Sequence, residues 1–266
     1  MSLHEYLLAD PQCDRLLEGA VWAVGPMLED PDPAPTLALV AGWAHELAGR
    51  MPLPWNFHGA VDVLNDFLFE EVGLRGDQET YDDPANAAIP QVLQRKRGMP
   101  ITLSILWLEV ARQLGFQAVG AALPGHFITG LQLDVGTLYF DPFNGGRALG
   151  EADAARLVDL STGGRIRFTP AMLNPVSNRA ILARLVRNLH VRYLRAHAWS
   201  EALWTSTHLV LLTPGEGLAF RDRAMVHFQR GEIAAGLGDL QEAIRLGQEI
   251  DAEMRPWLDM MKRATS

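Results

Sequence analysis

The feature that most constrains the fold is a helix expected in the middle of the chain, at residues 97–116, RGMPITLSILWLEVARQLGF. Pro100 suits the first helical turn, because its missing N–H would have no helical partner there, and Gly115 suits the end of the helix. From Ile101 to Leu108 the sequence is apolar on nearly every face. A helix of this kind is stable only when other elements surround it. We therefore expect a central, buried helix.

The residues after this helix predict a small antiparallel sheet. Three short runs rich in apolar and β-forming residues, QAVGAAL, HFITGLQL and TLYFD, fall within residues 117–141. They are separated by Pro124-Gly125 and by Asp134-Val135-Gly136, which are typical turn sequences. An FNGG loop follows, and an acidic helix is expected from near Gly150.

Helices are expected on both sides of this core. Residues 1–80 carry apolar side chains at helical spacing, with prolines between the segments, and one helix should run from Ala60 to Glu71. A turn-rich linker, YDDPANAAIP, leads to a short helix at Pro90 to Arg95. The combination of helices with a small antiparallel sheet predicts an α+β fold.

The chain beyond Pro175 is again helical in pattern. Tyr193, Ala202 and Pro214 stand at the offsets of a 34-residue helix–turn–helix repeat. A second copy would begin near Gly217, and its Gly236 would occupy the position of Ala202 in the first copy. Both are small residues, which suit a close helix crossing. We divide the chain into residues 1–172, the helical region plus the core, and residues 173–266, the repeat-like helices.

Tryptophans are frequent in this chain. We expect Trp43, Trp55 and Trp107 to lie in the hydrophobic core, which is the usual place for such large side chains. We expect Trp199 and Trp204 to lie in the core as well. The alternative is that they line a peptide-binding groove on the repeats.

The overall charge disfavours some partners. A formal charge of −9 and a pI of about 5.3 do not suit a protein that neutralises phosphates, so nucleic acid is not expected as a ligand. No apolar run approaches the roughly 18–20 residues that span a bilayer. The N-terminus, MSLHEYLLADPQCDRLLEG, lacks the basic and apolar regions of a secretion signal. We expect a cytoplasmic protein, and the sequence does not indicate an oligomeric state.

Cys13 is the single cysteine, so the chain cannot form an internal disulfide bond or a CxxC metal site. This composition fits a reducing cytoplasm. The histidines of the C-terminal helices show no HExxH or similar ligand pattern. We therefore predict no metal and no other cofactor.

His126 and Asp141 are the candidate functional pair. His126 opens one expected strand, and Asp141 closes the next, so the two side chains can meet across the sheet. An imidazole oriented by a carboxylate provides two of the three groups of a nucleophilic hydrolase or transferase. A strand-edge histidine and a turn aspartate that bonds its own backbone are the structural alternative. The sequence leaves open which residue, if any, is the third group.

The order of these motifs is similar to a known family. The buried helix, the histidine on one strand and the aspartate in DPF on the next resemble the transglutaminase-like, papain-fold superfamily. GMPITLS, PGHF and DPFNGG together resemble one bacterial branch, the Sir-B-type (YchA-like) proteins, in which tetratricopeptide helices follow the core. The resemblance covers residues from about 40 to 260 and is densest from 81 to 146.

This resemblance implies specific roles for several residues. In active members a cysteine begins the central helix, where the helix N-terminus favours thiolate, while the histidine moves the proton and the aspartate fixes its tautomer. His126 and Asp141 match the last two. The cysteine position falls at or near Pro100, which has no nucleophilic group.

Several outcomes remain open at this position. Ser104 or Thr102, in the first turns of the central helix, could replace the cysteine, or Cys13 could fold over the site. Otherwise the site is vestigial, or it binds without reacting.

Two classes of function follow. The first is a non-catalytic, regulatory protein that binds a polypeptide partner through the core cleft or through the concave surface that repeats provide. The second is a hydrolase or acyltransferase that uses Ser104 or Thr102 together with His126 and Asp141. The missing cysteine favours the first class.

Overall fold

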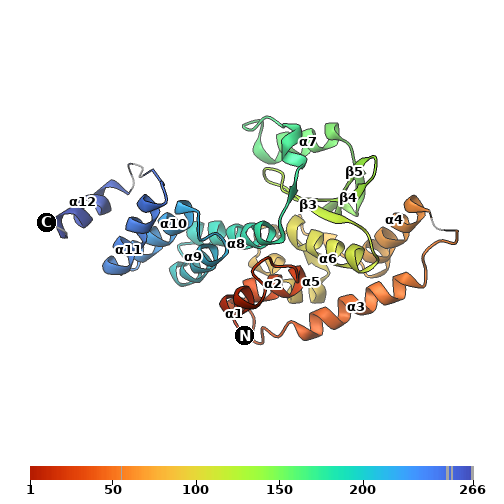
Figure 1. Cartoon of the computed structure of the whole chain (residues 1–266), viewed down its shortest axis with the longest axis horizontal. Coiled ribbons are helices and arrows are strands. Elements are labelled where there is room, and N and C mark those ends of the chain that lie inside the picture. The colour runs from red at the N-terminus through yellow and green to blue at the C-terminus, as the bar shows by residue number, and fades with distance from the viewer. Residues whose placement is uncertain (55, 250–251, 253, 265–266) are drawn as a thin grey trace. The chain divides into compact units, whose positions relative to one another are not determined.

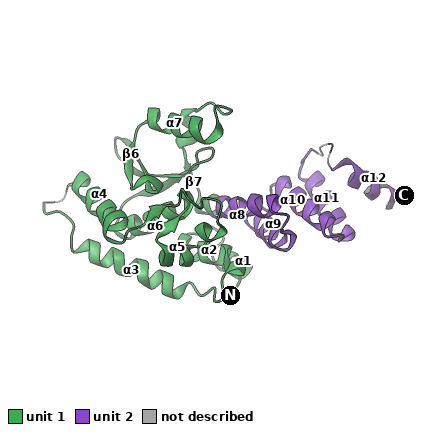
Figure 2. Ribbon diagram, turned by 180° about the vertical axis from the view of Figure 1, so that it is seen from behind, with its two compact units in different colours: residues 1–181 green, residues 182–266 purple. Residues whose placement is uncertain are grey.

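The computed structural model describes residues 1–54, 56–249, 252 and 254–264, so Trp55 lies outside the described residues. The chain divides into two compact units, Met1–Ile181 and Leu182–Ser266, whereas our sequence-based division lies between residues 172 and 173. Figure 2 colours the two units separately. No helix in the described ranges combines the length and hydropathy needed to cross a bilayer.

The predicted central helix is confirmed as α6, Pro100–Gln113. Every residue from Pro100 to Leu108 is buried, and Trp107 is fully enclosed, as expected for a helix that is apolar on all faces. Leu114 ends the helix, and Gly115 follows in the left-handed conformation with φ +88°. This helix packs against α3 (Ala34–Ala48), α2 (Leu16–Ala23) and the sheet and forms the centre of the first unit (Figure 1).

The antiparallel sheet has five strands in the order β6-β5-β4-β3-β7. The three predicted strands are confirmed, but β4 begins two positions after His126, which lies in the preceding turn and not on the strand. The two outer strands were not predicted, since each has only two or three residues. The strands are β3 (Ala118–Ala121), β4 (Ile128–Leu133), β5 (Gly136–Asp141), β6 (Arg147–Leu149) and β7 (Pro175–Val176).

The two faces of this sheet are covered by different helices. On one face Phe140 stacks on Trp107 of α6, with ring centroids 5.6 Å apart. On the other face α7, Glu151–Thr162, contributes Ala154 and Val158 to a core with sheet residues such as Ile128. Figure 1 shows the sheet between these two helices. The predicted acidic helix after Gly150 is thereby confirmed.

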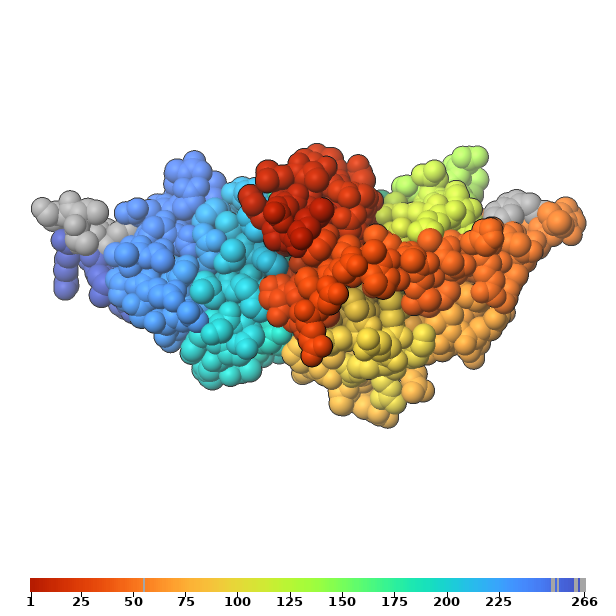
Figure 3. All heavy atoms as spheres, turned by 90° about the horizontal axis from the view of Figure 1, so that it is seen from below, coloured from red at the N-terminus to blue at the C-terminus, as the bar shows by residue number. Residues whose placement is uncertain are grey.

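The remaining helices of the first unit pack around α6. In the space-filling view, N-terminal residues coloured red to orange form much of one face of this unit (Figure 3). The predicted helix at Ala60–Glu71 begins earlier, at Phe57, and its last turn widens to a π-helix. The short helix before α6 is also confirmed, and two-residue strands β1 and β2 pair beside it. These elements are α1 (Leu3–Ala9), α2 (Leu16–Ala23), α3 (Ala34–Ala48), α4 (Phe57–Asn65) with its π-turn (Asp66–Glu71), β1 (Arg75–Gly76), α5 (Ile89–Arg95) and β2 (Arg97–Gly98).

The second unit is built from antiparallel helix pairs. Gly236 lies against the ring of Phe228, where a Cβ atom would collide, so the predicted close crossing of small residues is confirmed at this position. Tyr193 and Trp204 meet edge to face at 6.0 Å, and both are half-buried. The helices are α8 (Asn178–Arg195, which begins in the first unit), α9 (Trp199–Leu212), α10 (Gly217–Gln229), α11 (Ile233–Arg245) and α12 (Arg255–Ala264).

Candidate functional site

Thr102 is part of the cap that begins α6. The Met99 N–H donates to Thr102 Oγ1 at 3.1 Å, and the Thr102 hydroxyl contacts the carbonyl oxygens of Asn86 at 2.8 Å and Met99 at 3.0 Å. The side chain is fully buried. Its single hydroxyl hydrogen is therefore directed at main-chain oxygens, and its oxygen accepts from the Met99 N–H, which also bonds the Asn86 carbonyl at 3.3 Å.

Ser104 connects α6 to the turn that carries the histidine. Its hydroxyl donates to the carbonyl of Phe127 at 3.4 Å, and the side chain is fully buried. A serine inside a helix often bonds the carbonyl four residues earlier. Here it contacts the neighbour of His126 in sequence, so Ser104 lies close to the predicted site but offers no surface to a substrate.

His126 and Asp141 form the predicted pair. His126 Nε2 lies 2.9 Å from Asp141 Oδ1, and the two residues are 9% and 1% exposed. Asp141 ends β5, and the His126 N–H bonds the Leu123 carbonyl within the turn before β4. The structural alternative describes Asp141 in part, since this side chain also accepts from the Phe143 N–H of its own turn, but the two side chains bond each other as well.

Asp141 accepts further hydrogen bonds from the loop that follows it. Asn144 Nδ2 donates to Oδ2 at 2.7 Å, and the Phe143 N–H donates to Oδ1 at 3.1 Å. Burial raises the pKa of Asp141, but the hydrogen bonds from His126 and Asn144 outweigh burial and hold this pKa below its usual value. Asp141 is therefore ionised at neutral pH and can only accept, so Nε2 of His126 donates the hydrogen bond between them.

Asn65 is a site residue that the sequence did not reveal. Its Oδ1 accepts from the indole Nε1 of Trp107 at 2.8 Å, and its Nδ2 donates to the carbonyl of Gly146 at 3.0 Å. Gly146 has φ +71°, and a Cβ at this position would collide with the Asn65 side chain. Asn65 thus joins the loop after Asp141 to α6. The only signal was one amide in the apolar pattern VDVLNDFLF, and no motif marked it.

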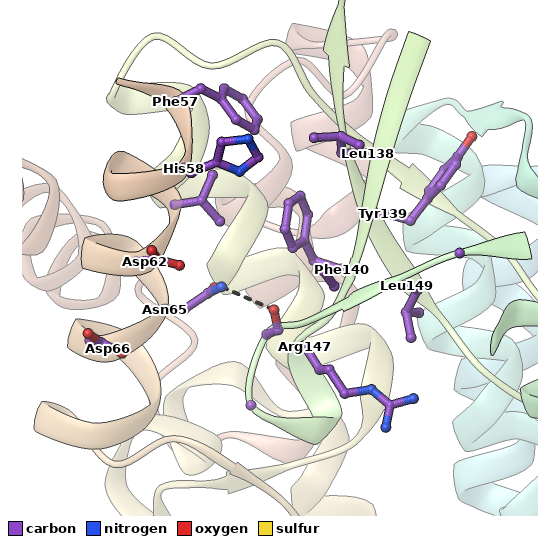
Figure 4. A pocket seen from close by; sticks show the side chains of 15 residues that line it. Phe57, His58, Asp62, Asn65, Asp66, Leu138, Tyr139, Phe140, Arg147 and Leu149 are labelled. Atoms are coloured by element: carbon purple, nitrogen blue, oxygen red, sulfur yellow. Dashed lines mark hydrogen bonds between the residues drawn. The ribbon is translucent and has the colours of Figure 1, made fainter. Parts of the chain in front are cut away.

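A groove of 530 Å³ lies beside this contact (Figure 4). One wall is α4, and the other is formed by β5, β6 and the glycines on either side of β6. Asn65 and Gly146 meet at one end of the groove. Sequence patterns had not indicated this groove, since its walls come from segments about 80 residues apart.

Cys13 lies far from the His126–Asp141 pair, near the other end of α6. Asn178 Nδ2 donates to the Cys13 carbonyl at 2.9 Å and accepts from Arg112, in the last turn of α6, at 3.1 Å. Ser104, beside the His126 turn, precedes Arg112 by eight positions, about 12 Å along the helix. Burial raises the pKa of the Cys13 thiol and so disfavours thiolate. The structure does not bring Cys13 to the site.

Metal ligands do not gather in the parts of the chain that the structure describes. No group of three or more His, Cys, Asp or Glu side chains there could hold a metal ion. In the second unit His190 bonds the hydroxyl of Thr205 at 2.9 Å, and His227 bonds Glu232 at 2.6 Å. These histidines pack within the helical repeat.

Comparison with known families gives two matches. Residues 36–187 match the transglutaminase-like superfamily, and residues 189–261 match the tetratricopeptide repeat. The first match contains α6, the sheet and the His126–Asp141 pair. The second contains most of the second unit.

Similar proteins occur in bacteria and in mammals. A UPF0162 protein of Xylella fastidiosa is 37% identical over 187 residues, which are 69% of this chain and 66%, just under two thirds, of that protein. A UPF0162 protein of Pseudomonas aeruginosa is 28% identical over 244 residues, 90% of this chain and 87% of the relative. F-box only protein 21 of Mus musculus is 31% identical over 137 residues, 48% of this chain and 21% of that protein. No solved structure matches the chain.

Proposed function

This chain belongs to the transglutaminase-like superfamily and carries tetratricopeptide repeats, and from this premise we propose that it is a non-catalytic, regulatory protein of the cytoplasm that binds a polypeptide partner. Repeat helices stack into extended surfaces that commonly bind peptides and proteins. The transglutaminase-like core then serves as a rigid binding domain.

The burial of both candidate nucleophiles carries this proposal. A nucleophile must approach a substrate carbonyl to about 3 Å, so it has to be accessible from outside. Thr102 and Ser104 are both 0% exposed. Thr102 is committed to the cap of α6, and Ser104 contacts a main-chain carbonyl. Pro100, which the resemblance places at or near the position of the family cysteine, is buried and has no reactive group.

A second candidate function is supported by the His126–Asp141 pair. An ionised, buried carboxylate bonded to an imidazole is the arrangement that activates a hydroxyl or thiol in hydrolases. Ser104 is the nearest candidate in position, because it bonds the residue that follows His126. A hydrolase or acyltransferase of this type requires α6 and the His126 turn to separate enough to expose Ser104.

Covalent labelling separates these two functions. The full chain is incubated with a fluorophosphonate probe, which reacts with activated serines, and the modified residue is identified by mass spectrometry. We expect no labelling above that of Ser104→Ala and His126→Ala. Labelling of the unmodified chain that disappears in both variants would establish the hydrolase and overturn the proposal.

Partner binding is measured on the same proteins. Peptides are selected from a displayed random library on the full chain, and their affinities are determined by anisotropy. Because binding needs no nucleophile, we expect the Ser104→Ala chain to retain each affinity within about twofold, a change of about 0.4 kcal/mol. A library that yields no specific binder would contradict the polypeptide-binding function.

A further inference from the structure

The groove between α4 and the edge of the sheet is not used by the His126–Asp141 pair. Its volume of 530 Å³ lies within the range of about 300–1,000 Å³ that is usual for ligand sites. Apolar side chains, among them Val61, Leu138 and Phe140, line it, and Leu138 is 41% exposed. A concave surface with such an apolar lining suits the side chains of a ligand or partner.

One side of the groove is an open strand edge. β6 is the last strand in the sheet order and, among the residues that the structure describes, pairs with β5 alone, while Arg147 and Ala148 are exposed. The neighbouring carbonyl of Gly146 is directed toward α4, where it accepts the hydrogen bond of Asn65 (Figure 4). An edge strand offers its outer main-chain groups to a further strand, and many domains bind extended peptides in this way. Because the Gly146 carbonyl bonds Asn65, it is not available to an added strand at this end of β6.

The opposite wall is negatively charged. His58, Asp62 and Asp66 are exposed at successive spacings of four residues on α4 and its extension, which places them along one side of the helix. Within the described residues, neither the Asp62 nor the Asp66 carboxylate forms a hydrogen bond or an ion pair. The cation on the other wall, Arg147, is paired with Asp153 at 3.4 Å, and its side chain points away from α4 in Figure 4. The two carboxylates therefore remain available to a cationic partner.

We propose that this groove binds an extended peptide segment rich in lysine or arginine, which adds a strand to the outer edge of β6 and places its cations against Asp62 and Asp66. The main chain of β6 supplies hydrogen bonds, the apolar lining takes the side chains that face it, and the two carboxylates select for positive charge. This inference rests on the proposed polypeptide-binding function and assigns one binding surface and one class of ligand to it.

Fluorescence anisotropy of the full chain with synthetic probes tests the proposal. The probe is a fluorescein-labelled peptide of alternating lysine and valine, about six residues long, which is a usual strand length. Three comparison peptides carry glutamate in place of lysine, N-methyl groups along the backbone, or the same residues in D-configuration. We expect binding of the lysine peptide only, because the glutamate peptide is repelled, the N-methylated peptide lacks the N–H donors of the ladder, and the D-peptide directs its side chains differently from the L-peptide.

The decisive variant is Asp62→Asn/Asp66→Asn, with Glu29→Gln/Asp134→Asn as its matched control. Both remove two exposed carboxylates of the first unit, but the control residues lie outside the groove. We expect at least a tenfold loss of affinity in the first and less than a twofold loss in the second. Hydrogen exchange should also slow at residues 146–149 when the lysine peptide is bound.

Three results would overturn the inference: no binding of the lysine peptide, equal losses in both double variants, or equal binding of the N-methylated peptide. The second indicates general attraction to an acidic surface, and the third indicates contacts without strand addition. None of these results changes the outcome of the labelling experiment, which tests the absence of catalysis. If one of these three results is found while the library selection still yields specific binders, the proposed function stands and this inference fails.

Discussion

Asn65 donates a hydrogen bond of 3.0 Å to the carbonyl oxygen of Gly146, a residue 81 positions later in the chain. The same side chain accepts the indole N–H of Trp107, so one amide connects α4, α6 and the loop after Asp141. This loop carries Asn144, which bonds the Asp141 carboxylate. Asn65 therefore contributes to the geometry of the His126–Asp141 pair without contacting either residue.

Asn65→Ala is expected to destabilise the first unit by about 2 kcal/mol. The substitution leaves the buried Nε1 of Trp107 without an acceptor, and an unpaired buried donor costs about 1–3 kcal/mol. Hydrogen exchange of α6 amides, followed by mass spectrometry, measures the change within this unit. Asp62→Ala, an exposed position on the same helix, is the control and should change stability by less than about 0.5 kcal/mol. Equal effects of the two substitutions would show that the Asn65 bridge has no special role.

Thr102→Val and Ser104→Ala should differ in stability. Valine keeps the shape of threonine but removes the 3.1 Å acceptor of the Met99 N–H and leaves it only the 3.3 Å bond to the Asn86 carbonyl, a loss that should cost about 1–1.5 kcal/mol. The Ser104 bond is long, at 3.4 Å, so its loss should cost less than about 1 kcal/mol. Urea unfolding followed by tryptophan fluorescence compares the variants. A larger loss in Ser104→Ala would contradict the assignment of Thr102 as the capping residue.

Local patterns predicted the elements of the core but not their cross-chain contacts. The apolar helix from Pro100, the three longer strands and the acidic helix after Gly150 each carry a periodicity or turn signal of their own. β6 and β7 are too short for any periodicity, and their pairing depends on the neighbouring strands. Asn65 gave no signal, because its partners lie on other elements. The burial of Thr102 and Ser104 likewise depends on segments that pack over α6.

Asp141→Asn should alter how stability depends on pH. In the folded chain the pKa of Asp141 lies below its usual 3.8, so the ionised form stabilises the fold above that value. This contribution is lost as pH falls from about 3.8 through the folded-state pKa. The difference in unfolding free energy between the parent chain and Asp141→Asn should therefore be largest near neutral pH and shrink below about pH 4. Urea unfolding at several pH values tests this, with Asp134→Asn as the charge-matched control. A difference that is constant with pH would contradict an ionised, hydrogen-bonded Asp141.

We expect His190 to make the second unit sensitive to acid, at a higher pH than that at which Asp141 affects the first unit. Burial lowers the pKa of this imidazole to about 4 from 6.5, so the folded chain binds its proton less readily than the unfolded chain. Stability is therefore complete above about pH 6.5 and falls as the pH decreases toward 4, by on the order of 3 kcal/mol in total.

His190→Leu tests this directly, because leucine fills a similar volume and does not titrate. The Thr205 hydroxyl, which bonds His190, still has the carbonyls of Glu201 and Ala202 as acceptors. Hydrogen exchange of α8 and α9 amides between about pH 7 and pH 4.5, corrected for the intrinsic rate, should show the loss of protection in the parent chain and a much smaller loss in His190→Leu. His45→Gln, at an exposed position of the first unit, should behave like the parent chain. If His190→Leu loses protection with acid as steeply as the parent chain, another group causes the acid sensitivity, and His190 is not buried in its neutral form.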